Sequence, residues 1–245
     1  MPQGSPMTIG IVGGMGSLAA AEFLNTMVRA FPAEKEWDRP RTVLDNACHM
    51  PSRVRALLYG EQRKELVCQM AEHIAGLVGL GCTDIVLCCN TSHVFLPEVL
   101  PLAEKLAGGR SFVLHHILRL LGEDLQKAGI SQVSLIATEG TIDVGIYPQI
   151  LGDYGVSVEC EGEAAYGELR FLIEAVKQDK MDAEALGRFV ALVNRQACPN
   201  VILGCTEFPL LRSRLGALAG ELTVALHDPL LSTIGALTRM YAQGR

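Results

Sequence analysis

The chain has 245 residues, 49% of them hydrophobic, and a formal net charge of −6. This length and composition can bury one large core or two of ordinary size, and a negative chain without clustered Lys and Arg is a poor partner for nucleic acid. No apolar run approaches the roughly 20 residues of a membrane span, and residues 1–7 lack the apolar core of a signal peptide.

Strand-like and helix-like patterns alternate along the whole chain. Strands are predicted over residues 8–12, 42–45, 84–88, 112–114, 132–137, 156–158, 201–203 and 223–226. Helices are predicted over residues 18–31, 62–80, 97–106, 142–151, 167–177, 183–197, 209–218 and 229–241. Such alternation is typical of parallel sheets that are covered by helices on both faces.

The order of these elements repeats in the second half of the chain. The glycine turn at residues 13–16 corresponds to residues 138–141, and Cys89 corresponds to Cys205. We therefore predict an α/β fold of two similar Rossmann-like lobes with parallel sheets, related by a pseudo-twofold axis.

The first lobe is predicted to comprise residues 7–112 plus 227–245 and to carry Cys89, and the second to comprise residues 113–226 and to carry Cys205. Open α/β sheets bind ligands at the carboxyl ends of their strands. We expect the active site between the two lobes, where those ends would face each other.

Cys89 and Cys205 each follow a β-branched apolar run and precede small polar residues. Two thiols that face one pocket can remove and return a proton at one carbon from opposite faces, and a helix that begins after each cysteine would favour the thiolate. Free cysteine is more often a small buried hydrophobic residue. We take six cysteines as structural: Cys48, Cys68, Cys82, Cys88, Cys160 and Cys198.

The cysteine spacing also bears on metals and compartment. None of the eight cysteines has the paired spacing of a zinc site. A chain with a good core does not need disulfides. We expect reduced thiols, no bound metal and a cytoplasmic protein.

Polar residues after the two cysteines are candidates for substrate binding. Asn90, Thr91 and Ser92 follow Cys89, and Thr206 follows Cys205. Their side chains and free backbone amides can bind a carboxylate, and the hydroxyl groups can equally cap helices. The sequence leaves both roles open.

The turn after the first strand has the G-x-G-x-x-A spacing of a dinucleotide site, which is a weak signal by itself. No acidic residue ends the second strand at the spacing that ribose binding needs. We therefore interpret Gly14 and Met15 as a turn whose backbone approaches a small anion.

Four charged or titratable residues lie in or near these motifs. Arg53 could clamp a carboxylate with two hydrogen bonds or be a solvated loop residue. His93 could tune the Cys89 thiol or be a satisfied helix histidine. Glu207 could relay protons or favour a helix start, and Asp228 is expected to cap the last helix.

These motifs together resemble the PLP-independent aspartate/glutamate racemase family, part of the Asp/Glu/hydantoin racemase superfamily. The matching segments run in order over nearly the whole chain: residues 9–16, 50–53, 89–93, 137–141, 204–207 and 228–229. The resemblance implies an isomerase that racemises an amino acid, with Cys89 and Cys205 as acid and base and Arg53 as the substrate clamp. It implies Thr138 among the binding residues, a two-lobed fold often found as a dimer, and no PLP or metal.

The chain departs from the family pattern at two places. Ser17 stands where a proline is usual. Aspartate-specific members have a lysine that meets the side-chain carboxylate, and it would fall in residues 163–168, which contain none. Tyr166 is the one large side chain there, and Glu163 or Glu168 would repel a second carboxylate if near. Neutral or larger amino acids are therefore expected to compete well with aspartate.

Two other functions stay open at this point. A related maleate-type isomerase or a decarboxylase would use one thiol as a nucleophile or lone proton donor. A non-catalytic binding protein for a small ligand would use the glycine turn alone. The second cysteine motif favours the racemase, because a binding module has no need of two matched thiols.

Overall fold

The computed structural model describes residues 7–244, so the expectation for residues 1–6 lies outside it. The chain divides into two compact units. Unit 1 runs to Ile117 and resumes at Ser232, and unit 2 is Leu118–Leu231. The predicted boundaries lay after residues 112 and 226, and the divisions fall after residues 117 and 231.

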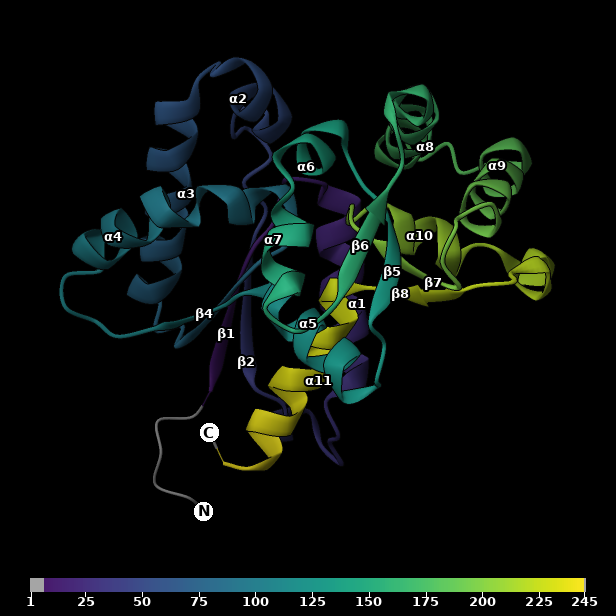
Figure 1. The fold of residues 1–245 in the computed structure, drawn as a ribbon. Coiled ribbons are helices and arrows are strands. Elements are labelled where there is room, and N and C mark those ends of the chain that lie inside the picture. Colours follow the sequence, from purple (N-terminus) through teal and green to yellow (C-terminus); the bar gives the residue numbers. More distant parts are fainter. Residues whose placement is uncertain (1–6, 245) are drawn as a thin grey trace. The chain divides into compact units, whose positions relative to one another are not determined.

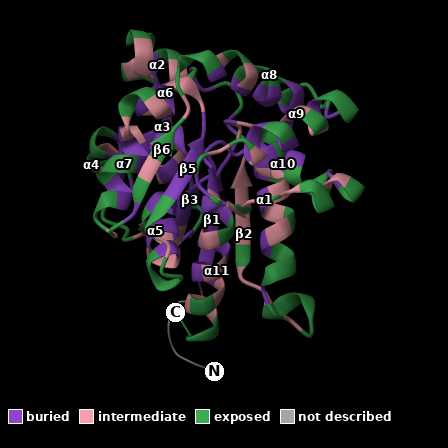
Figure 2. Ribbon diagram, turned by 45° about the vertical axis from the view of Figure 1, so that its right-hand side comes forward, coloured by how far each residue is buried: buried purple, intermediate pink, exposed green. Residues whose placement is uncertain are grey.

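Unit 1 is built on a four-stranded parallel sheet in the order β2-β1-β3-β4 (Figure 1). Central strand β1 is buried along its whole length, whereas edge strand β2 is half-exposed (Figure 2). The strands are β1 (Thr8–Val12), β2 (Arg41–Asp45), β3 (Asp84–Leu87) and β4 (Val113–His115).

The helices of unit 1 cover this sheet. They are α1 (Ser17–Ala30), α2 (Arg53–Tyr59), α3 (Arg63–Gly79) and α4 (Leu96–Leu106), with short 3-10 helices η1 (Glu36–Asp38) and η2 (Thr91–Phe95). Helices α3 and α4 pack against each other. Met70, Ile74, Ile85, Phe95 and Val99 are fully buried in the core that these helices share with the sheet.

Unit 2 repeats the same sheet, in the order β6-β5-β7-β8 and again all parallel. Its strands are β5 (Gln132–Ile136), β6 (Ser157–Cys160), β7 (Asn200–Leu203) and β8 (Ala225–His227). Strand β7 thus holds the position in unit 2 that β3 holds in unit 1. The predicted α/β fold with two Rossmann-like parallel-sheet lobes is confirmed.

The helices of unit 2 are mostly short. They are α6 (Glu139–Val144), α7 (Ile146–Gly152), α8 (Tyr166–Lys177), α9 (Ala183–Asn194) and α10 (Phe208–Ser213), with 3-10 helices η3 (Glu163–Ala165) and η4 (Gly216–Glu221). Helices α5 (Ile117–Lys127) and α11 (Pro229–Ala242) contain the two divisions between the units. Within residues 7–244, no helix has both the length and the apolar composition to cross a membrane.

The structure differs from the predicted elements where a glycine or a capping side chain sets the end of a helix. The predicted helix over 142–151 is broken at Gly145, whose φ of +68° does not fit a helix. Helix α2 was not predicted: Ser52 caps it by accepting from the Arg55 amide, and Gly60 ends it in the left-handed conformation. Helix α5 was also not predicted.

The turn between β1 and α1 packs tightly on the segment after β2. The Gly13 amide donates to the carbonyl oxygen of Asp45 at 2.8 Å. Gly14 has a φ of +78°, and a Cβ there would lie 2.3 Å from the carbonyl carbon of Ala47. No larger residue can occupy position 14 without moving the backbone, which fixes the place of Met15 next to it.

Asp228 caps the last helix, as predicted. Its Oδ1 accepts a hydrogen bond of 2.9 Å from the Leu230 amide. Burial raises the pKa of the Asp228 carboxyl to about 6, although the hydrogen bond from Leu230 and the charge of Arg212 oppose this rise. The cap therefore buries a carboxyl group that would ionise more readily in the unfolded chain.

The Asp228→Asn variant should change the pH dependence of stability. A raised pKa means that the contribution of Asp228 to stability is complete below its usual value of 3.8 and is lost as the pH rises through about 6. Asparagine keeps the capping oxygen and cannot ionise. The free energy of unfolding, measured with urea at a series of pH values, should therefore rise relative to wild type between pH ~4 and ~7, by about 2 to 3 kcal/mol.

The Asp228→Ala variant is the matched control for this experiment. It removes both the charge and the cap, and it should lose about 1 kcal/mol at low pH, where wild-type Asp228 is neutral. If the free energy of unfolding changes with pH in the same way for wild type and Asp228→Asn, the pKa of the buried Asp228 carboxyl is not raised.

Candidate active site

Cys89 lies just beyond β3, at the carboxyl edge of the unit 1 sheet. Cys89 is 8% exposed, and the preceding Cys88 is fully buried. The Cys88 amide donates to the carbonyl oxygen of Val12 at 2.9 Å. This bond extends the pairing of β1 with β3 by one residue and places Cys89 beside the glycine turn.

The polar residues after Cys89 are all buried. Asn90 precedes η2 without a side-chain cap bond, and Thr91 and Ser92 lie inside that 3-10 helix. Capping by the Thr91 or Ser92 hydroxyl, the alternative that the sequence left open, is therefore wrong. Ser92 Oγ instead donates to Met15 Sδ at 2.8 Å, which joins the Cys89 segment to the turn after β1.

Arg53 is the first residue of α2 and reaches back to the same turn. Its Nη2 donates to the carbonyl oxygen of Met15 at 3.0 Å, and its Nη1 to that of Pro51 at 3.1 Å. Its Nε is buried and has no hydrogen-bond partner. A buried donor without an acceptor is costly, so this nitrogen is left with an unmet capacity to donate a hydrogen bond.

Cys205 holds the equivalent place in unit 2, just beyond β7, and is 9% exposed. Its Sγ donates to Glu207 Oε2 at 2.9 Å, and Thr206 Oγ1 reaches the same oxygen at 3.4 Å. Glu207 is 2% exposed, and its Oε1 is buried without a partner. The thiol therefore lies against a carboxylate that is largely removed from water.

The structure decides whether Thr206 or Glu207 caps the next helix. The residue before α10 is Glu207, so Thr206 is not its N-cap, and the Glu207 side chain makes no cap bond. Gly204 lets β7 end close to β5, because a Cβ there would lie 2.6 Å from Leu135 Cδ1 and 3.0 Å from the carbonyl oxygen of Ile136.

Thr138 follows β5 at the same carboxyl edge, one strand away from Cys205. Its side chain accepts from the Thr141 amide at 3.4 Å and lies 2.9 Å from the Thr141 hydroxyl. Thr138 is therefore the cap of α6. Each unit thus gathers its own predicted residues at the carboxyl ends of its strands: Gly14, Met15, Arg53, Asn90, Thr91 and Ser92 near Cys89, and Thr138, Thr206 and Glu207 near Cys205.

Lys177, at the end of α8, is a residue of the Cys205 surroundings that the sequence did not reveal. The Lys177 side chain is 43% exposed. Partial burial would lower the pKa of its ammonium group, but the charge of Glu207, the hydrogen bond and charge of Glu174 and the charge of Cys205 outweigh burial and raise it. Its Nζ lies 3.1 Å from Glu174 Oε1. The signal that locates Lys177 is the packing of α8 against α10, which no local sequence pattern shows.

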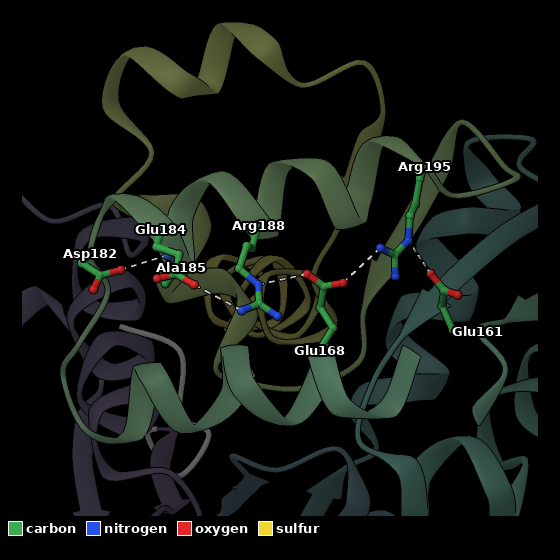
Figure 3. Close-up of polar contacts among 7 residues, drawn as sticks. All are labelled: Glu161, Glu168, Asp182, Glu184, Ala185, Arg188 and Arg195. Carbon is green, nitrogen blue, oxygen red and sulfur yellow. Dashed lines mark hydrogen bonds and ion pairs between the residues drawn. The ribbon is translucent and has the colours of Figure 1, made fainter. Parts of the chain in front are cut away.

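The stretch 163–168 has partners of its own. Glu168 lies between Arg188 (3.2 Å) and Arg195 (3.0 Å), and Arg195 also reaches Glu161 (Figure 3). Partial burial opposes ionisation of Glu168, but the two arginines prevail and lower the pKa of its carboxyl. Its charge is compensated within the α8–α9 pair, so Glu168 is less able to repel a substrate than the sequence suggested.

Tyr166, the first residue of α8, is hydrogen-bonded to α6. Its hydroxyl donates to Oδ1 of Asp143, a residue of α6, at 2.5 Å. This bond, together with partial burial, raises the pKa of Tyr166 to about 12. Tyr166 therefore stays protonated and engaged with Asp143.

Comparison with known proteins gives consistent matches. The chain is 26% identical to the glutamate racemase of Roseobacter denitrificans over 240 residues, which cover 88% of this chain and 78% of that protein. The structure of the Picrophilus torridus aspartate racemase superposes with a TM-score of 0.76 at 24% identity, over 96% of this chain and 99% of that one.

A second solved structure shows the same fold at greater distance. The glutamate racemase of Francisella tularensis, solved in complex with D-glutamate, superposes with a TM-score of 0.63 at 16% identity, over 97% of this chain and 82% of that one. The model of the Asp/Glu/hydantoin racemase family matches residues 12–240, which include both cysteine segments. The chain is a member of the Asp/Glu/hydantoin racemase family.

Proposed function

We propose that this protein is a cofactor-independent amino-acid racemase or epimerase in which Cys89 and Cys205 act as opposed acid and base at the α-carbon. One observation carries the proposal: the repeated fold places a buried cysteine just beyond each of the equivalent strands β3 and β7. The family membership of the chain supports the same reaction type.

The proposed reaction moves one proton off the α-carbon and another onto it. One cysteine thiolate takes the α-proton, and the electron pair of the C–H bond stays on carbon as a carbanion. The thiol of the other cysteine donates its proton to the opposite face, where that electron pair forms the new C–H bond. The two thiols have then exchanged protonation states, and the reverse reaction follows the same steps.

Glu207 gives Cys205 a means to hold and release its proton. The Cys205 thiol donates to the Glu207 carboxylate at rest. When Cys205 must act as a base, this carboxylate is an acceptor for its proton within hydrogen-bond distance. We therefore assign Glu207 to proton handling as well as to the binding surface predicted from the sequence.

The substrate carboxylate is proposed to bind the Arg53 guanidinium and the backbone of the turn at Gly14 and Met15. The unpartnered Nε of Arg53 supports this assignment, because a carboxylate would satisfy it. Further contacts are assigned to the polar residues near the two thiols: Asn90, Thr91, Ser92, Thr138 and Thr206. Neither PLP nor a metal takes part in the proposed reaction.

A homodimer in the cytoplasm completes the proposal. All eight cysteines are free thiols, which fits a reducing compartment. The dimer is proposed from the family resemblance alone.

A one-thiol isomerase or decarboxylase is the second candidate, because the two thiols have unequal surroundings. Cys205 Sγ is held by a buried carboxylate, and the hydrogen bond given to Cys89 goes to its backbone oxygen. A binding protein without catalysis is the third candidate. Isotope exchange separates these three functions.

The variants Cys89→Ser and Cys205→Ser should each lose racemisation by about 10²–10⁴-fold, because serine is nearly isosteric but a far poorer base. Each variant should still exchange the α-proton of one enantiomer with D₂O, and the two should differ in which one. Chiral analysis and ¹H NMR of the α-position provide the measurement.

Cys48→Ser is the matched control, since Cys48 is an exposed free thiol. It should keep full activity. Full racemisation in either active-site variant would exclude the two-base mechanism, and loss in one variant alone would favour the one-thiol enzyme.

Arg53→Ala should raise KM for the amino acid about tenfold to a hundredfold, because it removes a charge-assisted bond worth about 1.5–3 kcal/mol. Arg53→Lys should recover part of this loss, since a point charge cannot reproduce the planar fork. Arg55→Ala, on the exposed face of the same helix and paired with Glu61, is the control. Unchanged KM values in both Arg53 variants would make Arg53 a purely structural link to Met15.

Lys177 changes the expected substrate class. The sequence offered no cation in residues 163–168, which favoured neutral amino acids. Helix α8, which ends at Lys177, packs on α10, which begins directly after Glu207. An ammonium group at this place can instead pair with a second carboxylate on the substrate. We therefore propose acidic amino acids as substrates, in line with the glutamate and aspartate racemases among the relatives.

The ratio of kcat/KM for aspartate or glutamate over alanine, serine and methionine tests this proposal. Wild type should favour an acidic substrate more than about a hundredfold, or about 2.7 kcal/mol. Lys177→Met should lower that ratio at least tenfold, and Lys180→Met should not, because exposed Lys180 contacts Gln178. If wild type shows similar kcat/KM values for neutral amino acids and for aspartate, the proposal is wrong. The expectation of neutral substrates, drawn from the lack of a cation in residues 163–168, would then hold.

A further inference from the structure

His93 is bound directly to the backbone of Cys89. Its Nδ1 lies 2.9 Å from the Cys89 carbonyl oxygen. The residue is 2% exposed and lies inside η2, whose first turn is closed by the bond from the His93 amide to the Asn90 carbonyl at 3.1 Å. His93 thus makes two bonds near the thiol: its amide closes the turn after Cys89, and its ring bonds the Cys89 carbonyl.

The partner of Nδ1 fixes the tautomer of this imidazole. A carbonyl oxygen only accepts, so Nδ1 must carry the proton and donate it. Nε2 then bears a lone pair, and it is buried without a hydrogen-bond partner. The one N–H group of the ring therefore donates to the Cys89 carbonyl, and Nε2 has no hydrogen-bond partner.

The surroundings keep His93 neutral. Burial and the neighbouring His116, whose ring lies 4.7 Å away between centroids, lower its pKa to about 3. The carbonyl oxygens of Cys89, Asn90 and His115 oppose this lowering without overcoming it. An imidazole with a pKa of about 3 is neutral near pH 7, so His93 supplies no positive charge to the Cys89 thiol there.

We infer that His93 is a positioning residue, which fixes the Cys89 peptide through its Nδ1–H and thereby sets the direction of the thiol. The inference rests on the proposed function, in which Cys89 is one of the two bases. Strand β3 ends at Leu87, so Cys89 lies beyond the last residue of the strand. The imidazole takes over the role of a strand partner at this position, because it supplies the donor that the Cys89 carbonyl needs.

Three substitutions separate the donor at Nδ1 from the rest of the ring. In His93→Asn the amide nitrogen takes the place of Nδ1 and can donate to Cys89. In His93→Gln the amide nitrogen takes the place of Nε2, and in His93→Leu no donor remains. Asn and Leu have the same number of side-chain heavy atoms and branch at the same position, so their comparison isolates the hydrogen bond. Gln keeps an amide but moves its donor away from the Nδ1 position.

Two readouts test the position of the thiol. One is the rate of alkylation of Cys89 by iodoacetamide, divided by that of Cys205 in the same sample and measured by peptide mass spectrometry. The other is racemisation, as kcat and KM and as α-proton exchange from each enantiomer. The alkylation ratio needs no activity, so it tests the position of the thiol even if the proposed reaction is wrong.

His93→Asn should stay within about threefold of wild type in both readouts, with the same pH profile of kcat/KM. His93→Gln and His93→Leu should change the alkylation ratio about tenfold and lower kcat up to about a hundredfold, the cost of roughly 1 Å of misplacement. KM should change little, and the exchange lost should be that of the enantiomer lost in Cys89→Ser.

Two results would overturn the inference. An unchanged alkylation ratio and kcat in His93→Gln would make the histidine a core residue only. Loss of an ionisation from the pH profile in His93→Asn would make it an acid or base instead. If His93→Leu does not fold, as judged by its thermal transition, the Asn and Gln pair decides the question by itself.

Discussion

The parallel pairing of β1 with β3, and of β5 with β7, determines where the chemistry of this protein can be. Parallel neighbours need long crossovers, so residues distant in the chain end at the same edge of one sheet. In unit 1 the pairing of β1 with β3 brings Ser92 onto Met15, 77 residues away. The pairing of β1 with β2 brings Arg53 onto the Met15 carbonyl in the same way. The polar residues of the site depend on this edge, since they are held by strand ends and by the turns between them.

The two thiols are held in different ways by equivalent strands. Cys205 is held at its sulfur, by the carboxylate of Glu207. Cys89 is held at its backbone, by the imidazole of His93. One arrangement bonds the sulfur atom, and the other bonds the peptide that carries it. The repeated fold thus places a cysteine just beyond each of two equivalent strands, and its two copies hold that cysteine through different contacts.

The sequence predicted the strand ends that carry both cysteines, because an apolar β-branched run followed by small polar residues is a local pattern. Arg53 was identified, yet its place at the start of α2 was not, because a seven-residue helix has too few apolar positions to show periodicity. Gly145 broke a predicted helix that otherwise has good spacing. Lys177 was missed altogether, since its approach to Glu207 depends on how α8 packs on α10.

Unit 1 is discontinuous in the chain, and its last segment, residues 232–244, follows the whole of unit 2. Tyr241 in this segment packs its ring edge-on against Phe31 and donates to the Asp38 carbonyl at 2.5 Å. All of unit 2 therefore separates this segment from the rest of unit 1, and unit 1 cannot be complete until residues 232–244 have been made. A chain that lacks this segment would leave the Phe31 ring without its Tyr241 partner, and apolar surface exposed in this way favours aggregation and capture by chaperones.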